Sequence, residues 1–120
     1  HAYVMSESDS LAEQECEPCQ GGVPPMERDE IDEYLDEVGD HWEAVDDHHI
    51  ESHFEFDDFR DALEFVYDVG ELAEQEGHHP DIYLEYGASE IKFWTHKIDG
   101  LHEADFVMAA KVDEIYDEYA

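Results

Sequence analysis

The spacing of apolar residues predicts three amphipathic helices. The first covers residues 27–38, follows a pair of prolines and ends at Gly39; its apolar residues are Ile31, Tyr34, Leu35 and Val38. The second covers residues 58–76 and ends at Gly77, a common signal after a helix; its apolar face consists of Phe59, Ala62, Leu63, Val66, Val69 and Ala73. The third covers residues 102–118, with Phe106, Ala109, Val112, Ile115 and Tyr119 on one side.

A period of two predicts four strands between these helices. Residues 42–45 form a short apolar run, residues 46–49 a turn, and residues 50–56 alternate between apolar and polar side chains. Residues 81–86 and 89–96 also alternate, and Gly87-Ala88 between them suits a type II′ hairpin turn. The order α-β-β-α-β-β-α predicts an α+β fold, a four-stranded antiparallel sheet with helices packed on one face.

The predicted hairpin brings distant histidines together. A two-residue loop at Gly87-Ala88 gives the cross-strand pairs Leu84–Ile91, Ile82–Phe93, Glu85–Glu90 and, further out, His79–His96. His78 comes just before this last pair, so three imidazoles gather at one end of the sheet. Imidazole titrates near neutral pH, so such a cluster can offer an acid and a base at once. Loss of water from a substrate needs both.

The composition adds an unusual surface. The chain has 120 residues, 42% of them hydrophobic, and 36 acidic against five basic residues give a formal charge of −31. Because the apolar periods are clear, we interpret the charge as the surface of a folded, halophile-type protein: molar salt shortens the screening length to about 3 Å and removes most carboxylate repulsion. The charge argues against nucleic acid or an anionic membrane as a partner.

The chain is expected to form one domain over residues 23–120, preceded by a flexible arm over residues 1–22. Residues 1–4, before Met5, are interpreted as an added remnant. No apolar run is long enough to span a membrane and no secretory signal is apparent, so we expect a cytoplasmic protein. Cys16 and Cys19 form a single C-x-x-C pair without a second pair to complete a zinc site. A reduced loop feature is favoured over a redox or metal role.

Seven residues share the spacing of a known signature: Glu74, His78, His79, Pro80, Tyr86, His96 and Asp105. Over about residues 16–118 the chain thereby resembles the pterin-4a-carbinolamine dehydratase family, in its microbial form. The segment from Phe54 to Phe59, Trp42, and the C-x-x-C-x-G-G-x-P-P opening support this resemblance. Such a multi-part match is specific, whereas His-His-Pro alone would be weak.

The resemblance implies loss of water from 4a-hydroxytetrahydropterin to give quinonoid dihydropterin, without metal or cofactor, in a homodimer or homotetramer. His78 and His96 would be the acid/base pair, and His79 would complete the catalytic set and position the pterin. Pro80 would shape the pocket floor, and Trp94 is a candidate for stacking on the pterin, although core or interface packing suits it equally. Glu74, Tyr86 and Asp105 would support the motif.

Two positions depart from the family pattern. Gly77 replaces a common polar residue, and His102 replaces a Ser or Thr cap, so we expect a weaker cap with Asp105 serving the helix dipole. His48, His49 and His53 are expected to be solvated. Two other functions stay open: a pterin-binding or protein-dimerisation module without turnover, linked in some relatives to molybdopterin pathways, and metal capture by the histidines, which we rank low because no fixed carboxylate stands near.

Overall fold

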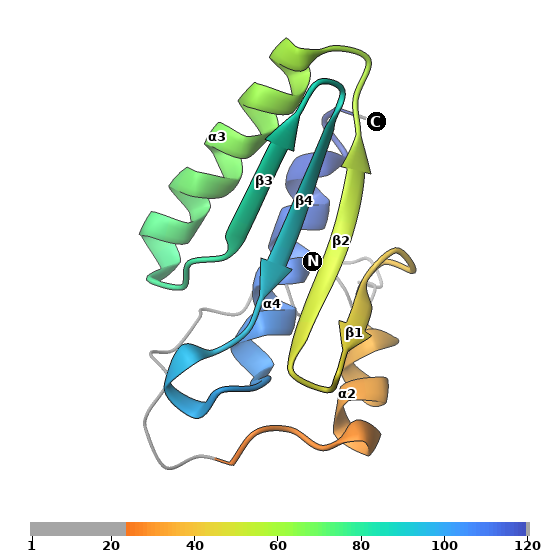
Figure 1. Cartoon of the computed structure of the whole chain (residues 1–120), viewed down its shortest axis with the longest axis vertical. Coiled ribbons are helices and arrows are strands. Elements are labelled where there is room, and N and C mark those ends of the chain that lie inside the picture. The colour runs from red at the N-terminus through yellow and green to blue at the C-terminus, as the bar shows by residue number, and fades with distance from the viewer. Residues whose placement is uncertain (1–23, 120) are drawn as a thin grey trace, which may run out of the picture.

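The computed structural model describes residues 24–119, which form one α+β domain. Its elements are α2 (Arg28–Leu35), β1 (Glu43–Val45), β2 (His49–Glu55), α3 (Phe59–Glu76), β3 (Asp81–Glu85), β4 (Ala88–Phe93), the short 3-10 helix η1 (His96–Ile98) and α4 (Glu103–Tyr116). The strands form one antiparallel sheet in the order β1-β2-β4-β3. Figure 1 looks onto the open face of this sheet, with α4 behind the strands. The predicted fold class and element order are confirmed, whereas Cys16 and Cys19 lie outside the described residues.

The two faces of the sheet follow the alternation of the sequence. Ile50, Phe54, Ile91 and Phe93 point toward the helices and are buried. Their neighbours along β2 and β4 point to the open face, where the side chains are polar and exposed or half-buried: His49, Glu51, His53, Glu90 and Lys92. The core therefore lies between the sheet and the helices.

The register of the β3–β4 hairpin differs from the predicted one by two residues. The loop is Tyr86-Gly87, so that Glu85 pairs with Ala88 and Ile82 with Ile91. Gly87 stands second in the loop with a left-handed φ of 74°, whereas a type II′ turn needs the glycine first. The expected pairs Glu85–Glu90 and His79–His96 are therefore wrong. The predicted faces survive, because a slip of two residues preserves the side-chain alternation.

Helix α3 has the predicted ends but a rotated buried face. Asp58 accepts a hydrogen bond from the Asp61 backbone at 2.9 Å, and Gly77 ends the helix in the left-handed conformation. Phe65 is fully buried although the predicted face omitted it, whereas Phe59 and Leu63 are 42% and 44% exposed. The extra aromatic is needed because Phe65 packs edge-on or tilted against the rings of Phe54, Phe56, Tyr116 and Tyr119.

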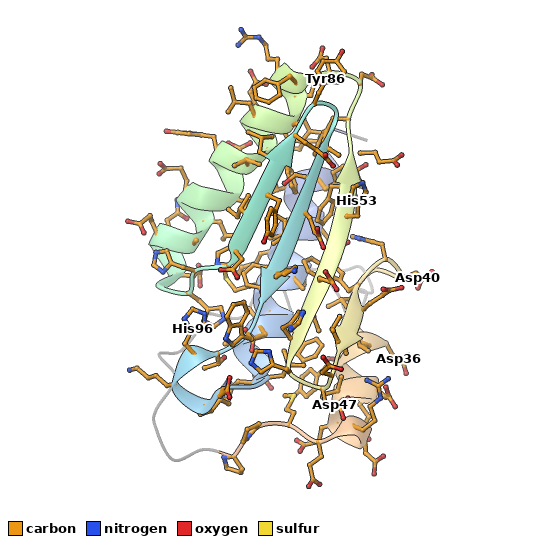
Figure 2. The ribbon with its side chains drawn as sticks, viewed as in Figure 1. Asp36, Asp40, Asp47, His53, Tyr86 and His96 are labelled. Atoms are coloured by element: carbon orange, nitrogen blue, oxygen red, sulfur yellow. The ribbon has the colours of Figure 1, made fainter. Side chains whose placement is uncertain are left out.

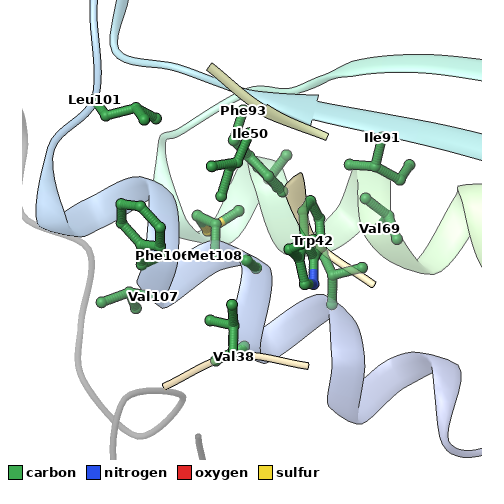
Figure 3. Close-up of a cluster of buried hydrophobic side chains, with 14 of the residues drawn as sticks. Val38, Trp42, Ile50, Val69, Ile91, Phe93, Leu101, Phe106, Val107 and Met108 are labelled. Atoms are coloured by element: carbon green, nitrogen blue, oxygen red, sulfur yellow. The ribbon is translucent and has the colours of Figure 1, made fainter. Parts of the chain in front are cut away.

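Helix α4 passes through the centre of the domain. Its first two turns are buried on nearly every side, including Val107, Met108 and Ala110, which the predicted one-sided pattern left out. Figure 3 shows the reason: side chains from the sheet and side chains such as Val38 and Trp42 surround the helix. Trp42 is therefore a core residue, and its indole N–H donates to Asp113 at 3.0 Å. Among residues 24–119, no helix combines the length and the apolar composition that crossing a membrane requires.

Candidate active site

The His-His-Pro segment is placed by the end of α3. Gly77 has a left-handed φ of 68°, and the backbone N–H groups of Gly77 and His78 both donate to the Ala73 carbonyl, at 2.9 and 3.2 Å. This arrangement ends the helix sharply. It leaves His78 and His79 in the connection to β3, at the end of the sheet where β4 finishes.

All three candidate histidines line one pocket of about 220 Å³, together with Gly77, Trp94, Thr95 and Lys97. The pocket is smaller than the roughly 300–1,000 Å³ usual for small-molecule sites, so it suits a flat ring more than a whole substrate. The convergence does not come from the expected pairing of His79 with His96. The ladder ends at the pair Asp81–Lys92, and His96 begins η1 beyond the end of β4.

A buried carboxylate joins the two halves of the site. Asp105 is 0% exposed and accepts three hydrogen bonds. One oxygen accepts from His78 Nε2 at 2.6 Å, and the other accepts from the Thr95 hydroxyl at 2.9 Å and the His102 backbone at 3.0 Å. Thr95 directly precedes His96. The same carboxylate therefore fixes His78 and the chain segment that carries His96.

The carboxylate also sets the tautomer of His78. An ionised carboxylate only accepts hydrogen bonds, so Nε2 of His78 carries a proton and Nδ1 is the nitrogen left for chemistry. The ring stacks on Phe93 with centroids 6.0 Å apart and planes at 12°, and the side chain is only 14% exposed. Phe93 and Asp105 thus fix His78 in position and in orientation.

Asp105 also caps α4. Its carboxylate accepts from the His102 backbone, while Nδ1 of His102 accepts from the Ala104 backbone at 3.2 Å. The reciprocal pair is a capping box with histidine in the place of Ser or Thr. Asp105 was expected to support the motif and to serve the helix dipole; the side chain also caps the helix and holds His78.

His79 is far more exposed than His78. Its Nε2 is hydrogen-bonded to the carboxylate of Glu74, one turn back on α3, and both side chains are mostly exposed. Such a pair adds little stability, but it orients the ring. Glu74 is therefore placed to support His79, as Asp105 is to support His78.

Trp94 lines the pocket and contacts three imidazoles. Its ring centroid is 4.5 Å from that of His96, 5.5 Å from that of His48 and 6.1 Å from that of His49. The expectation that His48 and His49 are solvated is wrong, since both are half-buried; His53 is exposed as expected. The pairing of β2 with β4 brings them here, because Ile50 pairs with Phe93 and the residues before and after that pair become neighbours.

Other signature residues lie further away. Tyr86 is 75% exposed in the hairpin turn, and Figure 2 shows it at the opposite end of the sheet from His96. Pro80 connects His79 to β3 and does not line the pocket. Within residues 24–119, no group of three or more His, Cys, Asp or Glu side chains is arranged to hold a metal ion.

Comparison with known proteins gives a consistent result. The sequence model of the family described as "Pterin 4 alpha carbinolamine dehydratase" matches residues 24–115. A protein from Rubrobacter xylanophilus is 54% identical over 105 residues, 88% of this chain and 97% of its own. One from Alkaliphilus metalliredigens is 50% identical over 105 residues, 88% of this chain and 95% of its own. Both relatives are named as pterin-4-alpha-carbinolamine dehydratases by inference.

The fold is also that of a solved structure. A crystal structure described as a "transcriptional coactivator/pterin dehydratase" from Brucella melitensis superposes with a TM-score of 0.71 at 32% identity. The superposition covers 76% of this chain and 97% of that one.

Proposed function

The chain belongs to the pterin-4a-carbinolamine dehydratase family, and we propose that it removes water from 4a-hydroxytetrahydropterin to give quinonoid dihydropterin. The 4a-hydroxyl leaves as water after it gains a proton, N5 loses its proton, and a C4a=N5 double bond forms. The reaction needs one base and one acid and consumes no other reactant. It is a hydro-lyase reaction of the histidine acid/base type.

The observation that carries this proposal is the bond between His78 and Asp105. A base must present an unprotonated nitrogen and tolerate a positive charge after it takes a proton. With Nε2 held by a buried carboxylate, His78 meets both conditions, because Asp105 stabilises the imidazolium. His78 is therefore proposed as the base for N5, and His96, which also lines the pocket, as the acid for the leaving hydroxyl. His79 and Trp94 position the ring.

Turnover of chemically generated 4a-hydroxytetrahydropterin in molar KCl tests the proposal. We expect His78→Ala and His96→Ala each to lower kcat about 100-fold or more, the usual effect of losing one acid or base. His79→Ala should mainly raise KM. His53→Ala is the matched control, because this exposed histidine on β2 lies away from the pocket. Wild-type kcat in both His78→Ala and His96→Ala would exclude the acid/base assignment.

We also propose that the protein acts as a homodimer or homotetramer. Phe59, Leu63 and Tyr67 lie four residues apart on α3, so they form one stripe on the helix, and they are 42%, 44% and 66% exposed. Leu63 and Tyr67 also line a hollow of about 520 Å³ with Glu64, Asp68 and Tyr119. An apolar stripe beside a hollow of this kind is typical of an interaction surface.

A pterin-binding or dimerisation module without turnover is the second candidate. It is favoured by the Brucella melitensis structure, whose name includes a transcriptional coactivator as well as a pterin dehydratase. The two functions separate in one experiment. Pterin binding that depends on His79, with no turnover by the wild-type protein in molar KCl, would support the module; turnover that depends on His78 and His96 would support the enzyme.

A further inference from the structure

Four aromatic rings form a cluster beside the pocket. We call it the Trp94 cluster, and its members are His48, His49, Trp94 and His96. Trp94 and His96 line the pocket, whereas His48 and His49 contact the indole but do not line the pocket. The side chains of Trp94, His48 and His49 are each half-buried. The indole that forms a wall of the pocket is thus held by two imidazoles with no place in the acid/base chemistry.

His48 connects two separate turns. Its backbone N–H closes the β1–β2 turn on the Val45 carbonyl at 2.9 Å, a turn in which Asp46 and Asp47 both have left-handed φ angles. Its Nε2 donates to the carboxylate of Asp99 at 2.7 Å. Asp99 is the left-handed residue that ends η1, the segment beginning with His96. One side chain therefore ties the β1–β2 turn to the segment that carries the proposed acid.

The contact between the two imidazoles admits only one proton. Nδ1 of His48 lies 3.1 Å from Nδ1 of His49, so one nitrogen donates and the other accepts. If both rings were charged, two N–H groups would point at each other and the contact would break. Burial first, then His48 and Lys92, lower the pKa of His49, while Asp46 and Asp81 oppose this effect.

We propose that His48 and His49 are positioning residues that hold the indole of Trp94 against the pocket and, through Asp99, hold the segment that begins with His96. This inference rests on the proposed function for its kinetic consequence, but the positioning itself does not. It predicts a site that loosens on acidification, when His49 takes up a proton and the contact between the two Nδ1 atoms breaks; the lowered pKa of His49 moves this step to lower pH.

The first test is kinetic. His49→Ala should raise KM about tenfold, because the indole proposed to contact the pterin ring loses its support. His48→Ala should have the same effect on KM and should also lower kcat about tenfold, because the segment that begins with His96 is no longer held through Asp99. Asp99→Asn should retain most of the activity, because its amide oxygen still accepts from His48, whereas Asp99→Ala should behave like His48→Ala. His53→Ala on the same strand should stay within about twofold of wild type. The side chain of Asp99 is 87% exposed, so neither substitution of Asp99 should lower the melting temperature much.

The second test reads the indole directly and needs no turnover. A protonated imidazole against an indole quenches its fluorescence, so wild-type emission should fall on acidification. His48→Ala and His49→Ala should each change the emission at pH 7 and weaken its pH dependence. The same substitutions in a Trp94→Phe background, where only Trp42 emits, should have no effect. Emission that is the same in wild type, His48→Ala and His49→Ala would overturn the proposal.

The two tests also separate this inference from the proposed function. If the wild-type protein neither binds nor dehydrates the pterin while the Trp94 emission responds to both histidines, the function is wrong and the positioning is right. If turnover depends on His78 and His96 but is unchanged in His48→Ala and His49→Ala, the function holds and the positioning role is wrong.

Discussion

Replacing Asp105 with Asn should reverse the proton on His78 without changing the shape of the site. One oxygen of Asp105 accepts from two donors, the Thr95 hydroxyl and the His102 backbone, and the other accepts only from His78. In the variant Asp105→Asn, the amide oxygen should therefore take the position with two donors. The NH₂ group then faces Nε2 of His78, which has to accept. The proton of His78 moves to Nδ1, the nitrogen proposed to act as the base.

The expected loss in kcat is large and the loss in stability moderate. A histidine held in the wrong tautomer cannot take the N5 proton, and the comparable change in a serine protease costs about 10⁴ in kcat; here we expect a loss of about 10²–10⁴. KM should change little. Three charge-assisted hydrogen bonds become neutral ones, at about 1 kcal/mol each. That is about 3 kcal/mol, which lowers the melting temperature of a domain of this size by more than about 10 °C.

Three measurements check this prediction: kcat with the carbinolamine, calorimetric melting, and the ¹⁵N shifts of the His78 ring, which report its tautomer. His102→Ala is the matched control, because it removes the side-chain half of the same capping box at a cost of about 1 kcal/mol and leaves the His78–Asp105 bond intact. It should lower the melting temperature and not kcat. A variant Asp105→Asn that has switched tautomer and still turns over within about threefold of wild type would refute the reasoning.

Further outcomes follow from the surface. Sedimentation in molar KCl should show a dimer or tetramer, and Leu63→Glu should weaken the association of the subunits. A monomeric wild-type protein would contradict the proposed assembly. The melting temperature and activity should rise together with KCl between dilute buffer and molar salt, since screening and salting-out both favour the compact state; a flat profile would mean that the acidic surface is not a salt adaptation. A hydrogen bond to Glu90 raises the pKa of Glu51, so the folded state binds this proton more tightly than the unfolded state does. The free energy of unfolding should therefore rise as the pH falls through the raised pKa of Glu51 toward its usual value of about 4.5. Glu51→Gln should stabilise the protein at pH 7 and reduce this rise in stability on acidification. An unchanged stability of Glu51→Gln at pH 7 would show that the two carboxylates do not interact. Acid should not restore activity, because the proposed reaction needs an unprotonated base.

The sequence was sufficient for the elements and for the two faces of the strands, because both depend on local periods, whereas the buried faces of α3 and α4 were predicted only in part. Helix α3 and its Gly77 end follow from residues within one segment. The hairpin register was not accessible in this way. Gly87 can stand first or second in a two-residue loop, and the choice moves every pair by two positions while leaving Ile82 and Ile91 on the buried face. Alternation alone cannot distinguish the two registers.

The site shows the same division. His78 and His79 are neighbours in sequence, and their link to His96 was predicted from the family signature and from a hairpin register that is wrong by two residues. The roles of His48 and His49 were missed because they depend on β2 lying beside β4, a pairing between strands separated by α3. Sheet order of this kind leaves no local pattern. The spacing around His48 is that of an ordinary polar turn.

The position of Asp105 links folding to chemistry in a single side chain. Its carboxylate accepts from His102 at the start of α4, from Thr95 after β4 and from His78 after α3, so it is fully satisfied only when all three segments are in place. A buried carboxylate that lacks one of its hydrogen bonds lowers stability. The three hydrogen bonds to Asp105 should therefore form cooperatively. The proton on Nε2 of His78 is then a consequence of the completed helix cap. We infer that the base is set by the fold itself, so that fraying of the α4 N-terminus should release the tautomer of His78 together with the segment that carries His96.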